Sequence, residues 1–179
     1  VMGLEDAEVE KLCKYVMETT GLKPLEPANF NAPGQVVVSG FKKAVEVLSS
    51  PLDTEKIFGE KKRLRVITLN VSAPFHCSMM KEAQDKMALI LGEVKVQTPQ
   101  FQVVQNVDAK VATSTEQIKQ NLVKQISSPV RWTQSINALR SSSIKRYVEC
   151  GPGKVLSGLI KKIDSDSSCL NIQSLDDIK

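Results

Sequence analysis

The sequence predicts an α/β protein built in two parts, and three observations support this prediction. Residues 1–71 alternate short apolar strands with two amphipathic helices, in the order strand, helix, strand, helix, strand. After residue 71 the pattern changes to longer helices separated by single apolar strands. With 179 residues, 41% of them hydrophobic, the chain is large enough to bury a core. We therefore expect a small ferredoxin-like α+β unit, followed over 72–179 by a part with α/β order.

Two helices and a central strand are expected in the first part. After the apolar start VMGL, Asp6 is predicted to cap a helix that Gly21 ends, because apolar residues between them recur at helical spacing. A loop rich in Pro and Asn, PLEPANFNAPGQ, then leads to an apolar strand at 36–38. The stretch FKKAVEVLSS is predicted to form the second helix, with Phe41 on its buried side.

A strand expected at 64–71 leads to the only histidine of the chain. Ile67, Leu69 and Val71 would share one face of this strand. His76 lies in VSAPFHCSMM, between that strand and a helix expected in CSMMKEAQDKMALILGEV. Side chains at strand ends can protrude beyond the sheet, where open α/β folds bind ligands, and imidazole is a common base near neutral pH. His76 is therefore a catalytic candidate, and a purely structural histidine is the alternative.

The second part is expected to alternate strands and helices. FQVVQNV is predicted to be a strand, two helices are predicted at 116–126 and 132–139, and the strand YVEC runs through GPGK into the helix VLSGLIKKI. GPGK suggests a phosphate loop, because its glycines open a helix whose N-terminal amides could bind an anion. It lacks the full phosphate-loop spacing, and Pro152 removes one amide donor, so a tight turn is favoured. The polar tail after Asp164 is expected to fray.

Charge, cysteines and hydropathy exclude several classes of protein. The chain has 24 Lys and Arg against 20 Asp and Glu, too small an excess for a dedicated nucleic-acid binder. Cys13, Cys77, Cys150 and Cys169 match no metal spacing, which predicts free thiols in a reducing compartment. No stretch approaches the ~20 apolar residues that cross a bilayer. We therefore expect a cytoplasmic protein with no metal, nucleic acid or membrane partner.

Few other side chains are candidates for chemistry. Cys77 adjoins His76, but neighbours at a helix start point about 100° apart, which makes a Cys–His dyad a poor prediction. No serine lies in a G-x-S-x-G elbow, so the candidate base lacks a nucleophile within these residues. In NFNAPGQ, the amides of Asn31 and Gln35 could hydrogen-bond an acyl or amide-bearing substrate, or the segment could simply form a turn.

Five blocks of the sequence together resemble one enzyme family. NFNAPGQVVVSG, VSAPFHCSMM, VVQNVDAKV, ISSPVRWTQSI and VECGPGKVLSGLIKKI resemble, in order and spacing, the malonyl-CoA:acyl-carrier-protein transacylases of fatty-acid biosynthesis. The resemblance runs from Val1 to about Ile163. It implies that 72–179 is part of an α/β-hydrolase-like large subdomain and that 1–71 is a ferredoxin-like small subdomain inserted into it.

The resemblance also implies an acyltransferase that works through a serine. The serine takes malonyl from malonyl-CoA, and the phosphopantetheine thiol of acyl carrier protein then removes it. His76 would be the general base, and the main-chain carbonyl of Gln125 would orient its ring. Phe75 matches a position that helps to set acyl selectivity, with core packing as the alternative, while Asn31 and Gln35 would lie near the substrate. Malonyl-CoA enters as a substrate, and no cofactor is implied.

In the family, the serine, the oxyanion-hole donors and an arginine for the malonyl carboxylate lie upstream of the matched blocks. The resemblance therefore implies a missing N-terminal segment as a partner, and these residues alone are expected to be inactive. One alternative is a non-catalytic module that binds acyl carrier protein through basic clusters such as Lys42-Lys43 and Lys161-Lys162. Another is a polyketide-synthase acyltransferase domain, which is disfavoured because the tail looks like a chain end.

Overall fold

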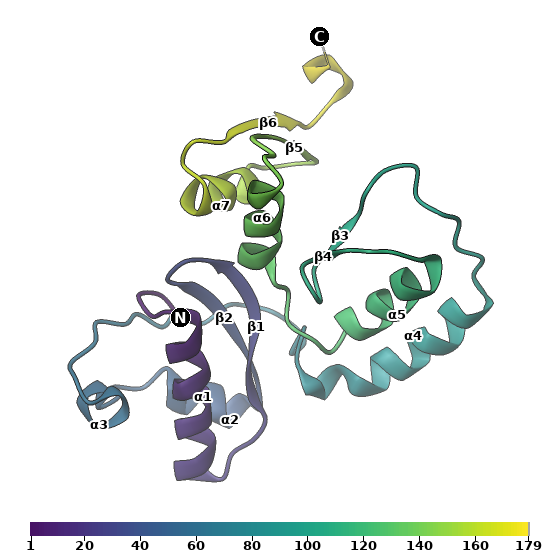
Figure 1. Ribbon diagram of the computed structural model, residues 1–179. Helices are drawn as coiled ribbons and strands as arrows, with labels where there is room; N and C mark the ends of the chain where they lie inside the picture. Colours follow the sequence, from purple (N-terminus) through teal and green to yellow (C-terminus); the bar gives the residue numbers. More distant parts are fainter. Residues whose placement is uncertain (179) are drawn as a thin grey trace.

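A computed structural model describes residues 1–178 (Figure 1). The elements follow in the order α1 (Asp6–Thr20), β1 (Leu25–Ala32), β2 (Gln35–Gly40), α2 (Lys42–Leu48), α3 (Thr54–Phe58), η1 (Ser78–Met80), α4 (Lys81–Glu93), β3 (Val104–Gln105), β4 (Lys110–Val111), α5 (Thr115–Gln125), α6 (Trp132–Ser141), β5 (Arg146–Cys150), α7 (Val155–Ile163), β6 (Ser168–Ile172) and η2 (Leu175–Asp177). In Figure 1 the N-terminal elements form one lobe, α4 and α5 lie beside each other, and α6 leads to a second lobe made of β5, α7 and β6.

The N-terminal lobe is built on an antiparallel hairpin. β1 pairs with β2 from Leu25 opposite Gly40 to the turn at the far end. On the free side of β2, Met2 forms antiparallel bridges to both Gln35 and Arg65. The order across the sheet is therefore β1, β2, Met2 and Arg65, with α1 and α2 in contact with the hairpin and with each other.

The hydrophobic core of the described residues lies in this lobe. The buried residues of α1 recur at helical spacing, which turns one apolar face of the helix toward the hairpin. The core cluster consists of Leu4, Val9, Leu12, Cys13, Val16, Leu25, Phe30, Val36, Ala44, Leu48 and Ile57. The lobe that carries β1 and β2 is therefore a well-packed platform for the rest of the chain.

The ends of the first two helices differ in part from expectation. Gly21 ends α1 with a left-handed φ of 72°, as predicted. The cap is Glu5 rather than Asp6, because Glu5 and Glu8 form a reciprocal capping box. Asp6 instead accepts a hydrogen bond from the side chain of Gln134 (3.0 Å). Phe41, expected to be buried, precedes α2 as its N-cap residue and is 39% exposed.

The strand expected at 64–71 is wrong except at Arg65, which bridges to Met2. Ile67, Leu69 and Val71 are 48%, 52% and 65% exposed, so their shared face is uncovered. Alternation alone does not make a strand, because the backbone also needs a partner for its hydrogen bonds.

Conversely, the stretch expected to be a loop before the 36–38 strand contains β1. Its register shifts next to Pro27 and again between Phe30 and Ala32, where bulges accommodate residues that a regular strand disfavours. The Pro and Asn residues that suggested a loop therefore mark an irregular strand.

The second part follows the expected order with two corrections. The helices predicted at 116–126 and 132–139 are α5 and α6, and the predicted YVEC strand and final helix are β5 and α7. The strand expected in FQVVQNV shrinks to β3, two residues paired with β4. The tail does not fray, because β6 pairs in parallel with β5 from Ser168 opposite Arg146.

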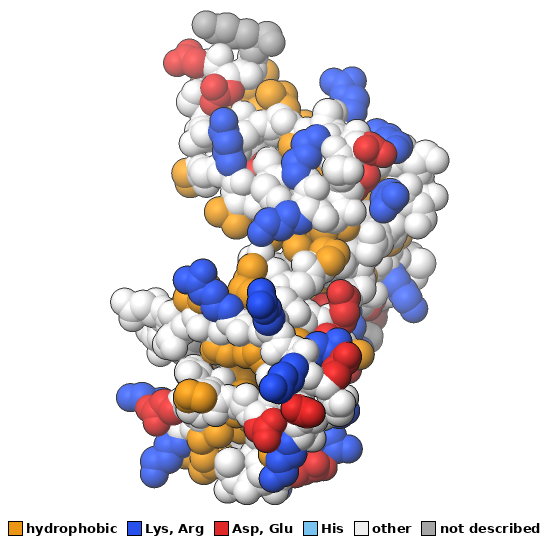
Figure 2. All heavy atoms as spheres, turned by 90° about the vertical axis from the view of Figure 1, so that its left-hand side faces the viewer, with side chains coloured by type: hydrophobic (Ala, Val, Ile, Leu, Met, Phe, Trp, Pro, Cys, Tyr) orange, Lys and Arg blue, Asp and Glu red, His pale blue; other side chains and the backbone are white. Residues whose placement is uncertain are grey.

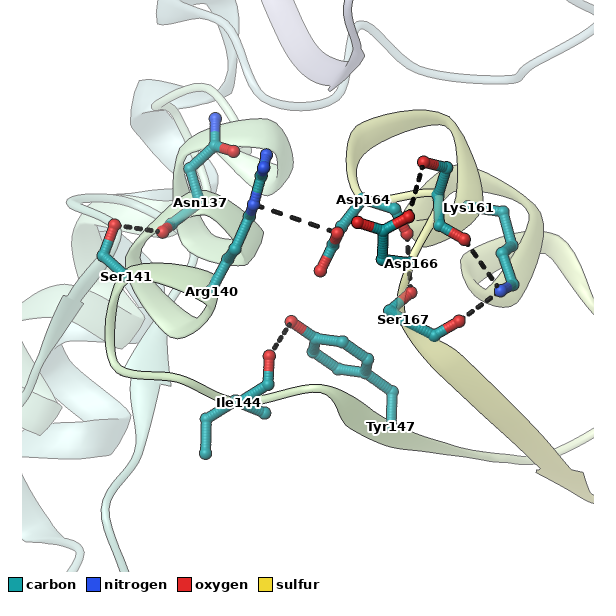
Figure 3. Close-up of polar contacts among 10 residues, drawn as sticks. Asn137, Arg140, Ser141, Ile144, Tyr147, Lys161, Asp164, Asp166 and Ser167 are labelled. Atoms are coloured by element: carbon teal, nitrogen blue, oxygen red, sulfur yellow. Dashed lines mark hydrogen bonds and ion pairs between the residues drawn. The ribbon is translucent and has the colours of Figure 1, made fainter.

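A polar cluster at the end of α7 turns the tail back along β5 (Figure 3). Asp164 is 3% exposed, and its Oδ1 lies 3.8 Å from Nε of Arg140 on α6. The hydroxyl of Ser167 donates to the carbonyl of Asp164 (2.7 Å). Lys161 donates to the carbonyls of Ser165 (3.2 Å) and Ser167. These contacts fix the turn between α7 and β6, which explains why a polar sequence is ordered here.

The β5–β6 sheet leaves apolar side chains uncovered. Val148 and Leu170 on the two strands are 55% and 54% exposed, and Val155 at the start of α7 is 71% exposed. Parallel sheets are normally covered on both faces. The second lobe therefore presents an apolar surface suited to another piece of polypeptide. No helix within residues 1–178 is long and apolar enough to cross a membrane.

Truncating the core should destabilise the N-terminal lobe. Leu12 is fully buried on α1, so Leu12→Ala should lower the free energy of unfolding by about 2–5 kcal/mol. Urea titration followed by circular dichroism measures this change. Lys14→Ala, on the exposed side of the same helix, is the control and should change stability by less than ~0.5 kcal/mol. Equal losses in the two variants would contradict the assigned core.

Candidate functional site

His76 lies in a turn immediately before η1, and its backbone is unusual. Its φ is 62°, in the left-handed region that few residues other than glycine adopt. Of its neighbours, Phe75 is 50% exposed and Cys77 is completely buried. The turn is thus fixed on its C-terminal side, while the imidazole remains partly accessible to solvent.

The imidazole of His76 is held by the main chain of Gln125. The Nδ1 atom lies 2.9 Å from the carbonyl oxygen of Gln125, across 49 residues of sequence. A carbonyl oxygen can only accept, so Nδ1 carries the proton and Nε2 keeps its lone pair. Gln125 is the last residue of α5, where carbonyls lack partners within the helix and the helix dipole is negative. The arrangement leaves Nε2 free to accept a proton from another group.

The carbonyl of Gln125 is itself fixed in place. The side-chain amide of Gln125 donates to the carbonyl of Ser128 (3.1 Å), which closes the turn after α5. The hydroxyl of Ser127 donates to the side chain of Gln84 on α4. Helices α4 and α5 also pack against each other. The helix that follows His76 and the helix that orients it therefore form one unit.

Phe75 lies next to the imidazole rather than in the core. The ring centroids of Phe75 and His76 are 6.5 Å apart and their planes are inclined by 50°. Within residues 1–178, half of the Phe75 side chain is exposed, so these residues do not bury it in a core. A role of Phe75 in acyl selectivity stays a prediction.

The Cys77 thiol is buried and is not available as a nucleophile. Its Sγ donates to the carbonyl of Pro74 (3.2 Å), and burial raises the pKa of the thiol. A buried, protonated thiol is a poor nucleophile. These contacts speak against a Cys77–His76 dyad, as the sequence predicted.

Asn31 and Gln35 lie near the turn of the hairpin. Gln35 begins β2, and its side-chain oxygen accepts a hydrogen bond from Lys162 on α7 (2.9 Å). Asn31 is half-buried at the bulge near the end of β1. No hydrogen bond within residues 1–178 joins either side chain to His76 or Gln125. Their contribution to substrate binding stays a prediction.

The GPGK turn does not offer its helix start to a phosphate. The carboxylate of Glu149 accepts from the backbone N–H groups of Leu156 (3.0 Å) and Ser157 (2.9 Å) and from the Ser157 hydroxyl. The bonds from Ser157 and then Leu156 hold the pKa of Glu149 below its usual range. The tight turn is therefore the better interpretation. Nowhere in the described part of the chain do three His, Cys, Asp or Glu residues gather as a metal site would require.

Sequence reasoning missed one residue at this site. Glu26 on β1 accepts from both the backbone N–H and the hydroxyl of Ser78, each at 2.8 Å. A weak signal existed, because the N-cap residue of η1, Cys77, makes no capping hydrogen bond with its own side chain. The first N–H groups of a helix start without a local cap are open to an acceptor from another element.

Comparison with known proteins gives a consistent result. No family model matches the chain. It is 42% identical to the malonyl CoA-acyl carrier protein transacylase of Staphylococcus aureus (strain MSSA476) over 179 residues, all of this chain and 56% of that protein. The chain is homologous to part of the malonyl CoA-acyl carrier protein transacylases. The transacylase of Escherichia coli (strain K12) is 40% identical over 163 residues, which are 91% of this chain and 50% of that protein. The chain thus spans about half the length of these relatives.

Solved structures of such transacylases share this fold. An acyl-carrier-protein S-malonyltransferase from Burkholderia pseudomallei 1710b superimposes with a TM-score of 0.86 and 36% identity, over 99% of this chain and 55% of that one. The same values hold for a malonyl-transacylase solved with a type II PKS acyl-carrier protein. The predicted mixture of helices and sheet is therefore confirmed at the level of an α/β fold.

The four cysteines should differ in reactivity in the native chain. Burial raises the pKa of Cys13 to about 12 and also raises that of Cys77, so at neutral pH neither is an appreciable thiolate. Cys150 is exposed. Iodoacetamide labelling followed by peptide mass spectrometry should therefore modify Cys150 first and leave Cys13 and Cys77 protected. Chain unfolded in guanidinium is the control and should label at all sites. Early labelling of Cys77 in the native chain would contradict its burial and would favour the Cys77–His76 dyad.

Proposed function

We propose that this chain supplies the general base of a malonyl-CoA:acyl-carrier-protein S-malonyltransferase of fatty-acid biosynthesis. The observation that carries the proposal is the 2.9 Å contact between Nδ1 of His76 and the carbonyl of Gln125. It leaves the other ring nitrogen as the proton acceptor, which is the form that general base catalysis requires. Homology to named malonyl transacylases supports the same assignment.

The proposed first half-reaction needs a serine from polypeptide outside these 179 residues. His76 takes the serine proton on Nε2 while the serine oxygen attacks the thioester carbonyl of malonyl-CoA. The C–S bond then breaks, and the imidazolium returns the proton to the departing CoA thiolate. Malonyl is left as an ester on the serine, and His76 is neutral again.

The second half-reaction reverses these roles. The phosphopantetheine thiol of acyl carrier protein gives its proton to Nε2 of His76, and its sulfur attacks the serine ester. The serine oxygen leaves and recovers the proton, so malonyl is carried away as a thioester. Proton transfers balance within each half-reaction, and the enzyme needs no redox group for them.

We also propose the two subdomains that the sequence suggested. A ferredoxin-like small subdomain at 1–71 is supported by the order of its extended segments across the sheet. Numbered along the chain, Met2 is the first, β1 the second, β2 the third and Arg65 the fourth. From Arg65 to β1 the order across the sheet is then 4-1-3-2, which is the order of the ferredoxin-like fold. An α/β-hydrolase-like large subdomain, partial in 72–179, is supported by the parallel β5–β6 pair with α7 between its strands. The exposed Val148, Val155 and Leu170 support a complementary segment that would bring the serine and complete the sheet.

A second candidate is a module that binds acyl carrier protein without catalysis. Figure 2 shows Lys and Arg side chains on both lobes of the face it presents, with Asp and Glu among them. Such a surface permits electrostatic docking of an acidic partner. A polyketide-synthase role is supported by the neighbour solved with a type II PKS acyl-carrier protein. The binding module does not explain why the only imidazole is oriented by a helix-end carbonyl, whereas a polyketide-synthase acyltransferase would use the same general base.

Replacing the proposed base should abolish most of the transfer. In the full-length transacylase that contains this chain, His76→Ala should lower the rate of malonyl transfer to holo acyl carrier protein by roughly 10²–10⁴-fold. Intact-protein mass spectrometry of the carrier measures the transfer. Lys110→Ala, at the exposed β4 strand, is the control and should transfer at the wild-type rate. Undiminished transfer by His76→Ala would remove the imidazole from the mechanism, and salt-sensitive carrier binding without transfer by the wild type would favour the binding module.

Removing the aromatic ring of Phe75 beside the proposed base should relax acyl selectivity. Phe75 is exposed next to His76, and in the proposed site it would crowd an α-methyl branch. Phe75→Ala should therefore raise the ratio of kcat/KM for methylmalonyl-CoA to that for malonyl-CoA by about 10-fold, within the range that one methyl group contributes in a fitted pocket. Competition between the two substrates measures the ratio. An unchanged ratio would place Phe75 outside the acyl pocket.

A further inference from the structure

We propose that Glu26 is a positioning residue for the base: from β1 of the N-terminal lobe, it holds the turn that carries His76. This inference rests on the proposed function for its catalytic meaning. Its structural content, that Glu26 sets the orientation of the imidazole, can be tested without any transfer assay.

The contact is a two-pronged one between distant parts of the chain. Oε2 of Glu26 accepts from the backbone N–H of Ser78, and Oε1 accepts from the Ser78 hydroxyl, both at 2.8 Å and across 52 residues of sequence. Hydrogen bonds to an ionised carboxylate are stronger than those between neutral groups, and two of them define a direction as well as a distance. Ser78 lies two residues after His76, so its position limits where the imidazole can go.

Glu26 also takes the place of a missing cap. The helical segment after His76 begins at Ser78, and the side chain of its N-cap residue Cys77 makes no capping hydrogen bond. The first N–H groups of a helix have no partner within it, and they carry the positive end of the helix dipole. A carboxylate delivered from another element satisfies both requirements. The start of η1 and α4 is therefore attached to β1 rather than capped by its own sequence.

The turn needs such an attachment because its backbone is unusual and the chain that leads into it is exposed. His76 has a left-handed backbone, which persists only where the surroundings impose it. The chain that leads to it is largely exposed from 67 to 72 and forms no strand there. On the far side, Cys77 is buried and Ser78 is bound by Glu26. Together with the Gln125 carbonyl at the ring itself, these contacts determine the direction of Nε2.

Glu26 is fixed well enough to serve as an anchor. It follows Leu25, which is completely buried, and it pairs with Ser39 in the hairpin. β1 is also bonded on its other edge, where the N–H of Phe30 donates to the carbonyl of Val130 (2.8 Å). A carboxylate on this strand therefore has a defined location relative to the helix that it caps.

The first test uses the fact that the chain has a single histidine. Long-range ¹H–¹⁵N correlation of the imidazole at alkaline pH should report one tautomer, with the proton on Nδ1. In Glu26→Ala both bonds to Ser78 are lost, and the spectrum should shift to a mixture of the two tautomers. Glu26→Gln keeps one acceptor and should lie between them. Glu46→Ala, which removes an exposed carboxylate from α2 of the same lobe, is the matched control and should retain the wild-type spectrum.

The second test asks whether Glu26 acts through Ser78. Ser78→Ala removes the hydroxyl bond only, so its spectral change should be smaller than that of Glu26→Ala, and the double variant should match Glu26→Ala alone. In the full-length transacylase, Glu26→Ala should lower kcat for malonyl transfer about 10-fold with KM for malonyl-CoA unchanged, because misorientation of a base affects the chemical step. If Glu26→Ala unfolds the N-terminal lobe, its circular dichroism signal will fall. Glu26→Gln and Ser78→Ala then provide the comparison with the wild type.

The outcomes separate this inference from the proposed function. A wild-type tautomer in Glu26→Ala, or additive effects in the double variant, would overturn the positioning role. A tautomer mixture in Glu26→Ala, combined with normal transfer by His76→Ala, would uphold the positioning of the ring and reject its use as the base. A tautomer mixture with a lower kcat supports both.

Discussion

The candidate site depends on one hydrogen bond, from Nδ1 of His76 to the carbonyl of Gln125. A neutral imidazole can carry its proton on either nitrogen, and only one of the two forms presents a lone pair to a substrate hydroxyl or thiol. A helix-end carbonyl selects that form without adding a full negative charge. Because the carbonyl keeps the proton of Nδ1 in place, Nε2 is the ring atom that would accept a proton and return it to a leaving group.

The hydrogen bond joins residues that are far apart in sequence, and strand β1 gives them a common reference. On the His76 side, Glu26 holds the start of the following helix. On the Gln125 side, the segment between α5 and α6 is joined to β1 through Val130, whose N–H donates to Ala28 and whose carbonyl accepts from Phe30, both at 2.8 Å. Each partner is thus fixed to the same strand, and that strand is part of the buried core. The geometry of the site therefore derives from the packing of the N-terminal lobe.

The sequence predicted the local features of this arrangement better than the distant ones. His76 was identifiable because it is the only imidazole and lies before an amphipathic helix. Its pairing with Gln125 came only from resemblance to a family, because no periodicity marks a carbonyl 49 residues away. Glu26 was missed for the same reason, because the uncapped start of the helix after Cys77 does not indicate which distant residue binds it. Strand β6 was missed because its pairing depends on a turn fixed by Asp164, and a polar composition gives no sign of such a turn.

The strand wrongly expected at 64–71 and the open β5–β6 pair have a common cause. In both, an apolar pattern typical of sheet is present, but within the described residues the side chains that it carries are exposed: Leu69 is 52% and Val148 is 55% exposed. An apolar strand pattern fits a pleated surface that is packed against neighbouring side chains, and the pattern is present in the sequence even where the described residues do not supply those neighbours. The relatives are about twice as long as this chain, which gives room for such a partner. Because His76 and its orienting groups are attached to the buried N-terminal lobe, their geometry does not depend on a cover over the apolar face of the second lobe.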